Sequence, residues 1–134
     1  MDIVINDPRV GEWVREAIPK VRCWTEGFKS LAAVENGELV GAVVYDAFTP
    51  YECCIHVRLD KPGCKTPQVL REVFSYPFEQ LKLRRLTGLV GSNNEKGRKL
   101  CIWLGFHLEG CKKDALGDEN EMVYGMVRED CRWL

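Results

Sequence analysis

Short apolar runs typical of strands alternate with helical repeats along the chain, and Gly, Pro and Asn separate them. In the first half, strand-like runs cover residues 2–5, 30–35, 38–46 and 51–59, and Asn36-Gly37 separates the second run from the third. Two such runs around an Asn-Gly pair are the strongest short-range sign of a β-hairpin. The first half therefore predicts a short strand followed by a three-stranded meander.

A helical repeat separates the first strand from this meander. Asp7 and Pro8 suit the N-cap and the first turn of a helix, and Pro19 stands where that helix should stop. The apolar positions between them recur at helical spacing: Val10, Trp13, Val14, Ala17 and Ile18. The pattern predicts a helix that starts at Pro8.

The second half predicts two more helices and three more strands. Thr66-Pro67 is a cap followed by proline, ahead of a helical stripe that Pro77 should bend or end near Tyr76. Asn94 caps a helix that runs to about Leu104, and Gly105 takes the C′ position after it. Leu100, Trp103 and Leu104 are expected to face inward. Strands are expected at 84–91, 106–112 and 121–128.

The predicted element order is β-α-β-β-β-α-β-α-β-β, a mixed α/β sheet with helices on its faces. Helical crossovers join 51–59 to 84–91, so these two strands should be parallel, and the remaining neighbours antiparallel. A length of 134 residues with 46% hydrophobic and 29% charged residues fits a single domain over 1–134.

Composition also bears on location and metals. No apolar run reaches the roughly 18–20 residues that span a bilayer, and the N-terminus lacks the features of a signal peptide, so we expect a cytoplasmic protein without membrane contact. The seven cysteines form no CxxC pair, and neither histidine lies at a ligand spacing from a cysteine pair. The sequence therefore predicts free thiols and no metal site.

Charge is concentrated in one central segment. Residues 61–99 hold nine basic and three acidic side chains, whereas both flanks are acidic and the whole chain has a net charge of −1. This balance argues against a general nucleic-acid binder. The basic block suits a polyanionic ligand such as a nucleotide or coenzyme A, and the competing interpretation is a solvated basic face. The acidic first block could attract a cationic acceptor.

The loop at 61–67 has the chemistry of an anion site. A strand is followed by Lys61, Gly63 and Lys65 and then by a capped helix N-terminus, where free N–H groups and the helix dipole favour negative charge. Pro67 removes one of those donors, and many strand-to-helix junctions share the pattern.

The element order resembles that of the GNAT superfamily of acyl-CoA-dependent N-acyltransferases. The best motif runs from Asn94 through the small Gly97 and an apolar helix to Leu104-Gly105-Phe106-His107-Leu108-Glu109-Gly110, similar to the family's Asn and LGF-x-x-EG pattern. Residues 117–126 resemble the last hairpin of the branch related to ribosomal-protein N-acetyltransferases. Residues 74–81 and 128–134 resemble small phage and prophage members of the family.

The resemblance implies a V-shaped opening between strands 51–59 and 84–91 that binds acetyl-CoA as co-substrate, without a metal. The pantetheine arm would pair with the backbone of Val57, Arg58 and Leu59, and the pyrophosphate would lie over the loop at 61–67. The residues implied for the loop and for the facing helix are Gly63, Cys64, Lys65, Thr66, Asn94, Gly97 and Arg98.

Two positions depart from the family pattern. The usual pyrophosphate loop ends in a small residue, but here Thr66 or Pro67 stands there. Many members place a Tyr seven residues after the motif Asn, as general acid to the leaving thiolate, and this chain has Cys101. A thiol with a pKa of about 8.5 could serve as that acid, and a core role for Cys101 is the alternative.

The base is expected on the strand at 51–59. On a strand, Glu52, Cys54, His56 and Arg58 share one face. His56 is the first candidate, since an imidazole is the side chain best suited to accept a proton from an amine near neutral pH, and Glu52 is the second. The competing interpretations are a hydrogen-bonded structural histidine and an exposed carboxylate.

The implied reaction is direct attack of a primary amine on the thioester of acetyl-CoA. The acceptor stays open among a protein N-terminus, a lysine, a small amine and a modified nucleobase, and a homodimer is compatible with the sequence. The alternative is a catalytically weak or inactive GNAT-shaped binding module, such as a phage protein that docks on a host protein or lies in the virion. A nucleic-acid partner is disfavoured because the flanks of the basic block are acidic.

Overall fold

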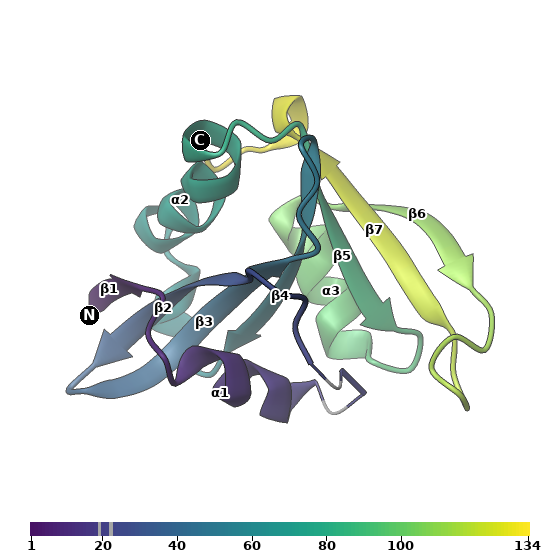
Figure 1. Cartoon of the computed structure of the whole chain (residues 1–134), viewed down its shortest axis with the longest axis horizontal. Coiled ribbons are helices and arrows are strands. Elements are labelled where there is room, and N and C mark those ends of the chain that lie inside the picture. The colour runs from purple at the N-terminus through teal and green to yellow at the C-terminus, as the bar shows by residue number, and fades with distance from the viewer. Residues whose placement is uncertain (19, 22) are drawn as a thin grey trace.

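One continuous seven-stranded sheet runs through the computed structural model, which describes residues 1–18, 20–21 and 23–134 (Figure 1). Its order is β1-β2-β3-β4-β5-β7-β6, and every neighbouring pair is antiparallel except β4 and β5, which are parallel. The strands are β1 (Asp2–Ile5), β2 (Lys29–Glu35), β3 (Glu38–Asp46), β4 (Glu52–Leu59), β5 (Arg85–Gly91), β6 (His107–Lys112) and β7 (Glu121–Val127). The predicted mixed sheet and its single parallel crossover are confirmed.

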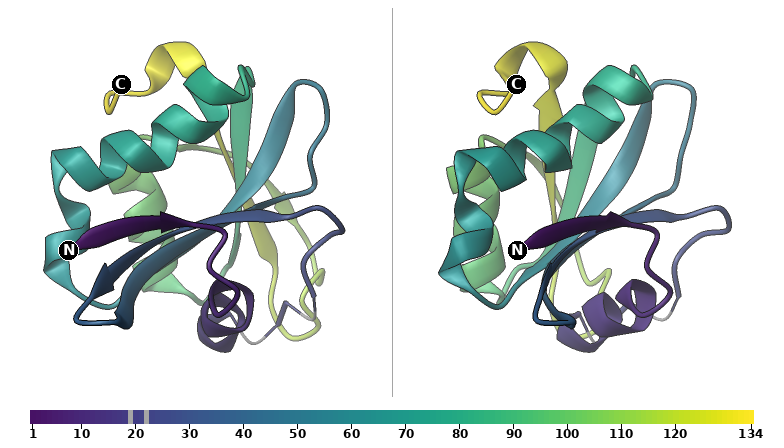
Figure 2. Two further views of the ribbon diagram at one scale, coloured as in Figure 1. Left: turned by 60° about the vertical axis from the view of Figure 1, so that its left-hand side comes forward. Right: turned by 90° about the vertical axis from the view of Figure 1, so that its left-hand side faces the viewer.

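The described residues form three α-helices, which cover the two faces of the sheet (Figure 2). Helix α1 (Val10–Ala17) packs on β2, β3 and β4 through a small apolar cluster that includes Val10, Val14 and Val44. Helices α2 (Pro67–Ser75) and α3 (Glu95–Leu104) lie on the opposite face, over the larger core around Phe74 and Leu86. The sheet therefore has a separate apolar core on each face, a small one under α1 and a larger one under α2 and α3.

The first helix starts later than predicted, at Val10 instead of Pro8. The Asp7 carboxylate accepts the Arg9 backbone N–H at 2.9 Å and also pairs with the Arg9 guanidinium. These local bonds hold residues 8 and 9 in a turn, so Asp7 caps the turn and not the helix. The predicted stop at Pro19 lies outside the described residues.

The caps of the other two helices are confirmed. The Thr66 hydroxyl accepts the Val69 N–H at 3.3 Å, and Asn94 Oδ1 accepts the Gly97 N–H at 2.9 Å. Gly105 ends α3 with a φ of +110°, which favours glycine. At Pro77 the α-helical bonding stops after Ser75, as predicted, and one π-helical turn (Tyr76–Gln80) follows it, because proline has no N–H to donate.

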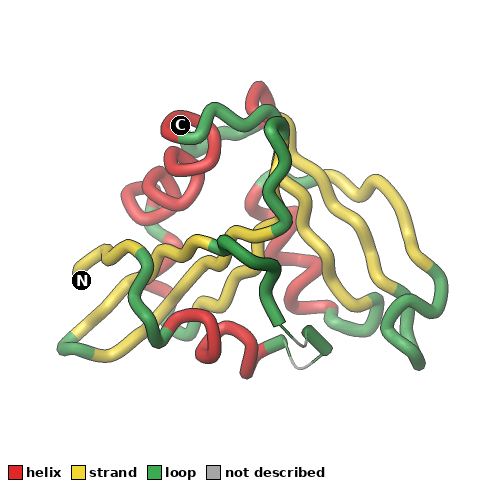
Figure 3. Tube along the Cα trace, in the orientation of Figure 1, coloured by secondary structure: helices red, strands yellow, loops and turns green. Residues whose placement is uncertain are grey.

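The parallel pairing of β4 and β5 is short, and this creates the opening of the fold. It runs from Glu52 opposite Arg85 to Ile55 opposite Gly88, and beyond these residues the two strands diverge. β4 then continues to Leu59 paired only with β3 among the described strands, and β5 continues paired with β7 (Figure 3). The predicted V-shaped opening between these strands is present.

A buried thiol fixes the loop at one side of this opening. Cys64 lies in a 3-10 turn (Pro62–Lys65) that the sequence did not predict, is fully buried, and donates its thiol proton to the Val40 carbonyl at 3.5 Å. A Cβ added at Gly41 would lie 2.7 Å from Cys64 Sγ and 3.2 Å from the Leu59 side chain. The missing side chain at Gly41 therefore lets the turn dock on β3 and sets the place of Lys65.

We expect Gly41→Ala to lower the free energy of unfolding by about 1–3 kcal/mol, because overpacking displaces Cys64 and the turn that it anchors. Urea denaturation measures the change, and the cost should shrink in a Cys64→Ala background, where the sulfur is absent. Gly110→Ala is the matched control, since a Cβ there meets nothing within 4 Å. An equal cost of Gly41→Ala in both backgrounds would contradict this account.

Candidate functional site

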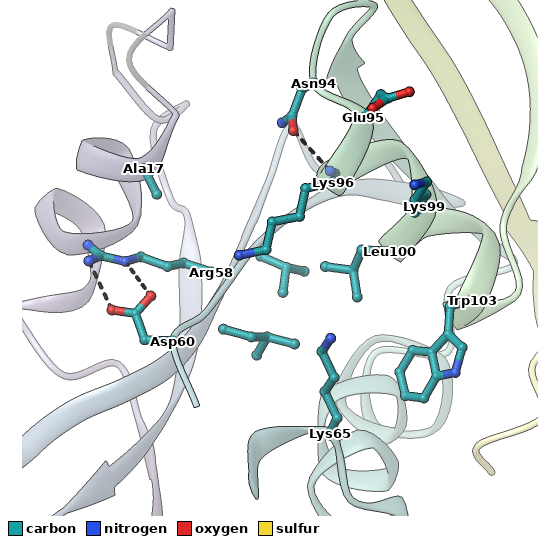
Figure 4. A pocket seen from close by; sticks show the side chains of 13 residues that line it. Ala17, Arg58, Asp60, Lys65, Asn94, Glu95, Lys96, Lys99, Leu100 and Trp103 are labelled. Atoms are coloured by element: carbon teal, nitrogen blue, oxygen red, sulfur yellow. Dashed lines mark hydrogen bonds and ion pairs between the residues drawn. The ribbon is translucent and has the colours of Figure 1, made fainter. Parts of the chain in front are cut away.

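A cleft of about 850 Å³ lies where β4 and β5 diverge, between the end of β4 and one face of α3 (Figure 4). Six of the residues that the sequence analysis assigned to the cofactor line it: Val57, Arg58, Leu59, Lys65, Asn94 and Gly97. They come from the strand, the loop and the helix in turn, so only the folded chain brings them together.

The structure places the other four predicted cofactor residues away from the lining of this cleft. Cys64 is buried against β3, and Thr66 uses its hydroxyl to cap α2. Arg98 donates to the Tyr124 hydroxyl at 3.0 Å and to the Ser92 carbonyl at 3.3 Å, across α3 from the cleft. Gly63 lies in the 3-10 turn, next to the side chain of Met1.

The sequence analysis missed the residues that α3 presents to the cleft. Lys96, Lys99, Leu100 and Trp103 all line it, because positions three or four apart lie on one face of a helix. The prediction that Trp103 faces inward is wrong, since this residue is 42% exposed. The available signal was two lysines that share a helix face with large apolar residues.

The cleft carries net positive charge, because its lining holds four basic side chains and the two carboxylates of Asp60 and Glu95. Arg58 is paired with Asp60 at 3.0 Å, and its guanidinium lies 3.9 Å from the centre of the Trp13 ring. Lys65, Lys96 and Lys99 have no ion-pair partner within the described part of the chain. Three unpaired ammonium groups around one cleft favour a ligand with several negative charges.

The exposed edge of β4 adds backbone groups to the cleft. Beyond Ile55 no described strand pairs with the side of β4 that faces β5. Backbone N–H and C=O groups that lack a strand partner are strong hydrogen-bonding groups, and an extended ligand with amide bonds can pair with them as an added strand would. Val57, Arg58 and Leu59 supply this edge.

A smaller cavity, of about 130 Å³, leads from the cleft between the two diverging strands. It shares Ala17, Val57 and Asn94 with the cleft and is also lined by His56 and Cys101. His56 belongs to the face of β4 that α1 covers, whereas Cys101 lies on α3 at the opposite face. The opening thus connects the two faces of the sheet at these residues.

His56 is held in place by a buried carboxylate. His56 Nε2 lies 2.8 Å from Asp46 Oδ1, both side chains are less than 10% exposed, and the Trp24 ring lies 4.8 Å from the imidazole. Since a carboxylate only accepts, Nε2 carries a proton and Nδ1 is the free acceptor of the neutral ring. Burial would raise the pKa of Asp46, but the hydrogen bonds from His56 and from the Thr25 N–H outweigh it and hold this pKa below its ordinary value.

Solved structures that resemble this one are acetyltransferases. A point mutant of spermidine N-acetyltransferase SpeG from Vibrio cholerae has a TM-score of 0.73 and 10% identity, covering 100% of this chain and 98% of that chain. The ribosomal-protein-S5-alanine acetyltransferase from Vibrio fischeri has a TM-score of 0.66 and 19% identity, covering 93% and 72%. The chain has the GNAT fold.

A third GNAT-fold structure holds the co-substrate expected from the sequence. The Campylobacter jejuni N-acetyltransferase PseH, in complex with acetyl coenzyme A, has a TM-score of 0.59 and 18% identity, covering 87% of this chain and 76% of that chain. Some of these proteins are longer, and this chain spans 62% of one further acetyltransferase. No family model and no curated protein matches the sequence.

No helix in the described ranges is long and apolar enough to cross a membrane. Across residues 1–18, 20–21 and 23–134, no three His, Cys, Asp or Glu side chains are grouped as a metal ion would require.

The structure places Glu52 in a charge cluster at the start of β4, not on the lining of either cavity. It accepts a hydrogen bond from the Thr87 hydroxyl at 2.6 Å and lies 3.4 Å from Arg85 Nε. Arg85 in turn donates to Glu109 at 2.8 Å, and this bond lowers the pKa of the Glu109 carboxyl. Of the two candidate bases, only His56 lies at the opening.

Burial changes the chemistry of Cys101. Loss of solvent raises the pKa of its thiol to about 11. An ordinary thiol has a pKa of about 8.5, so proton transfer from Cys101 to a free thiolate would be uphill. Cys101 therefore lies where a general acid would be useful, but its thiol is too weakly acidic for that role.

The Asp46 pair predicts a pH-dependent stability. The pKa of Asp46 is lower in the folded chain than its ordinary 3.8, so its stabilising effect is complete above about pH 4 and is lost as pH falls through the folded value. We expect Asp46→Asn to lower the free energy of unfolding by about 1–3 kcal/mol at pH 7, with the difference shrinking at lower pH. Denaturation of both proteins at a series of pH values measures it, with the exposed Asp2→Asn as control. A difference that stays constant down to about pH 3 would contradict this reading.

The thiol of Cys101 should be slow to alkylate at neutral pH. Only thiolates react readily, and a pKa of about 11 leaves few of them. We expect iodoacetamide to label the exposed Cys23 and Cys111 first, with Cys101 labelling accelerating only in strongly alkaline buffer. Peptide mass spectrometry follows each site, and rapid labelling of Cys101 in the folded protein at neutral pH would refute the shift.

Proposed function

We propose that this protein is an acetyl-CoA-dependent N-acetyltransferase that acts on a primary amine. One observation carries the proposal: a single opening joins a cationic cleft on one face of the sheet to His56, held by Asp46, on the other. The acetyltransferase structures that share the fold support it, and one of them is in complex with acetyl-CoA. The seven free cysteines fit an activity in the reducing cytoplasm.

The residues of the cleft fit the parts of acetyl-CoA. The free edge of β4 can pair with the amides of the pantetheine arm, and the unpaired lysines can neutralise the phosphates. At Gly97 the chain has no room for a side chain, since a Cβ there would lie 2.6 Å from Asn94 Nδ2 and 3.0 Å from Val90. This glycine keeps α3 close to β5 and leaves the floor of the cleft clear for the arm.

Acetyl-CoA supplies an activated acetyl group as a thioester. The amine nitrogen attacks the thioester carbonyl, a C–N bond forms, the C–S bond breaks, and coenzyme A leaves as a thiolate. His56 takes the proton that the amine loses, at Nδ1, and the Asp46 carboxylate stabilises the imidazolium. Proton transfer from Cys101, with a pKa of about 11, to the thiolate would be uphill, so the thiolate of coenzyme A is protonated by the acid form of the solvent buffer after it leaves.

The acceptor amine would reach the thioester from the face that α1 covers. The cavity between the strands is narrow, and Ile18, Ile55 and Leu89 give it apolar walls. A slender chain that ends in a primary amine fits such a passage, which keeps a protein N-terminus, a lysine side chain and a linear small amine as acceptors. A charged ammonium must lose one proton to solvent before it enters this apolar passage, and the proton that the amine loses on attack goes to His56.

His56→Gln separates binding from catalysis. We expect calorimetry to give a dissociation constant for acetyl-CoA within about threefold of the wild type, because His56 lies beyond the cleft, while the rate of coenzyme A release with a panel of amines falls at least about 100-fold. The matched control is His107→Gln, the same change at an exposed histidine of β6. Equal rates for the two variants would remove His56 from the reaction.

A second candidate is a GNAT-shaped binding module, and the half-buried Cys101 favours it because its thiol lacks the acidity of a proton donor. The resemblance of residues 128–134 to phage proteins would then indicate a host protein as the partner. Tight binding of acetyl-CoA without coenzyme A release across peptides, lysine and linear amines would support this module over the enzyme.

A further inference from the structure

One exposed residue of the cleft is an indole ring. Trp103 is 42% exposed and lines the cleft, and Lys65 Nζ lies 5.8 Å from the centre of its ring. Figure 4 shows Trp103 at the margin of the cleft with the Lys65 side chain rising beside it. A large aromatic side chain left open inside a cleft offers a flat apolar surface to a bound ring.

The C-terminal segment 131–134 holds this indole in one orientation. The Trp133 ring lies 5.3 Å from the Trp103 ring at 46°, and Trp133 Nε1 donates to the Leu104 carbonyl at 2.8 Å. The Arg132 guanidinium donates to the Trp103 carbonyl and lies 5.6 Å from the Trp103 ring and 4.4 Å from the Trp133 ring. A ring fixed in this way loses little entropy when a ligand stacks on it.

The charges around Trp103 indicate what kind of ring it would bind. Lys96 and Lys99 lie on the same face of α3, Lys65 faces them from the loop, and none of the three has an ion-pair partner in the described ranges. A planar aromatic surface ringed by unpaired lysines matches a nucleotide, whose base stacks and whose phosphates are anionic. A purely apolar partner would leave three ammonium groups unused.

We propose that Trp103 is a stacking platform for the purine base of coenzyme A, that Lys65 and Lys99 bind its phosphates, and that Trp133 and Arg132 position the platform. This proposal rests on the proposed function, because it assigns the nucleotide end of the same co-substrate. It makes the nucleotide end of the cofactor, and not only the pantetheine arm, a determinant of affinity.

The test uses ligands that carry only one end of coenzyme A. Adenosine 3′,5′-bisphosphate carries the base and phosphates without the arm, and S-acetylpantetheine carries the arm without the nucleotide. We expect Trp103→Ala to weaken binding of the bisphosphate and of acetyl-CoA by about tenfold in calorimetry, equivalent to about 1.4 kcal/mol and within the range for stacking of one base. Binding of S-acetylpantetheine should not change.

Trp103→Phe is the second variant, because it keeps an aromatic face. It should retain most of the affinity for the bisphosphate but lose the quenching of tryptophan fluorescence that we expect when the wild type binds it. Lys65→Gln combined with Lys99→Gln should weaken the bisphosphate further, and Lys113→Gln is the control for charge because Lys113 is exposed in the loop after β6. Arg132→Gln should weaken the bisphosphate severalfold, with thermal melting as the check that each variant folds.

The outcomes separate this inference from the proposed function. If the bisphosphate binds wild type and Trp103→Ala equally, or if S-acetylpantetheine loses as much affinity as acetyl-CoA, the platform is refuted even when acetyl transfer is normal. If the bisphosphate binds through Trp103 but no amine is acetylated, the platform stands and the proposed function falls. Equal binding of ATP and the bisphosphate would overturn the assignment to coenzyme A.

Discussion

The end of the parallel ladder at Ile55 and Gly88 is the constraint on which the rest of this site depends. Two strands that stay paired leave no room between them and no free backbone groups. Two strands that part leave one edge of β4 unpaired and open a passage through the sheet, with α3 across the gap. In most proteins such an unpaired edge can pair with another chain and cause aggregation. Here an extended ligand can pair with it, so the edge can serve as a binding site.

The two ends of the passage differ in the charged groups that surround them. On the side of α2 and α3, unpaired lysines surround a wide cleft that suits anionic groups. On the side of α1, a histidine and a carboxylate are buried together beneath an indole, in the setting where a proton can be taken up and stabilised. A molecule with a charged end and a reactive end can therefore lie across the sheet with each end in a matching environment.

Helix α3 links these regions through one face. Its cap at Asn94 and the glycine at 97 bring it close to β5, and its later turns carry lysine, leucine and tryptophan toward the cleft. The C-terminal segment packs against the last turn and orients Trp103. Residues about 30 positions apart in the sequence thus act on the same part of the cleft.

The sequence by itself determined the elements, because breakers, caps and apolar spacing are local: seven strands, three helices, the caps at Thr66 and Asn94, and the parallel crossover were all predicted. It also indicated much of the cleft, through a basic segment and a family motif. The helix start was the exception, because Asp7 caps a turn over residues 8 and 9 and the α-helix begins at Val10.

Only the tertiary structure decided which side chains meet. Asp46 reaches His56 because the register of β3 on β4 brings them together, and no spacing in the sequence reports that register. Trp103 is exposed and Cys101 is half-buried, although both lie on one helix, because exposure depends on what the remote strands and the C-terminal segment cover. The chemistry of this site follows from long-range packing, whereas the scaffold that carries it follows from local pattern.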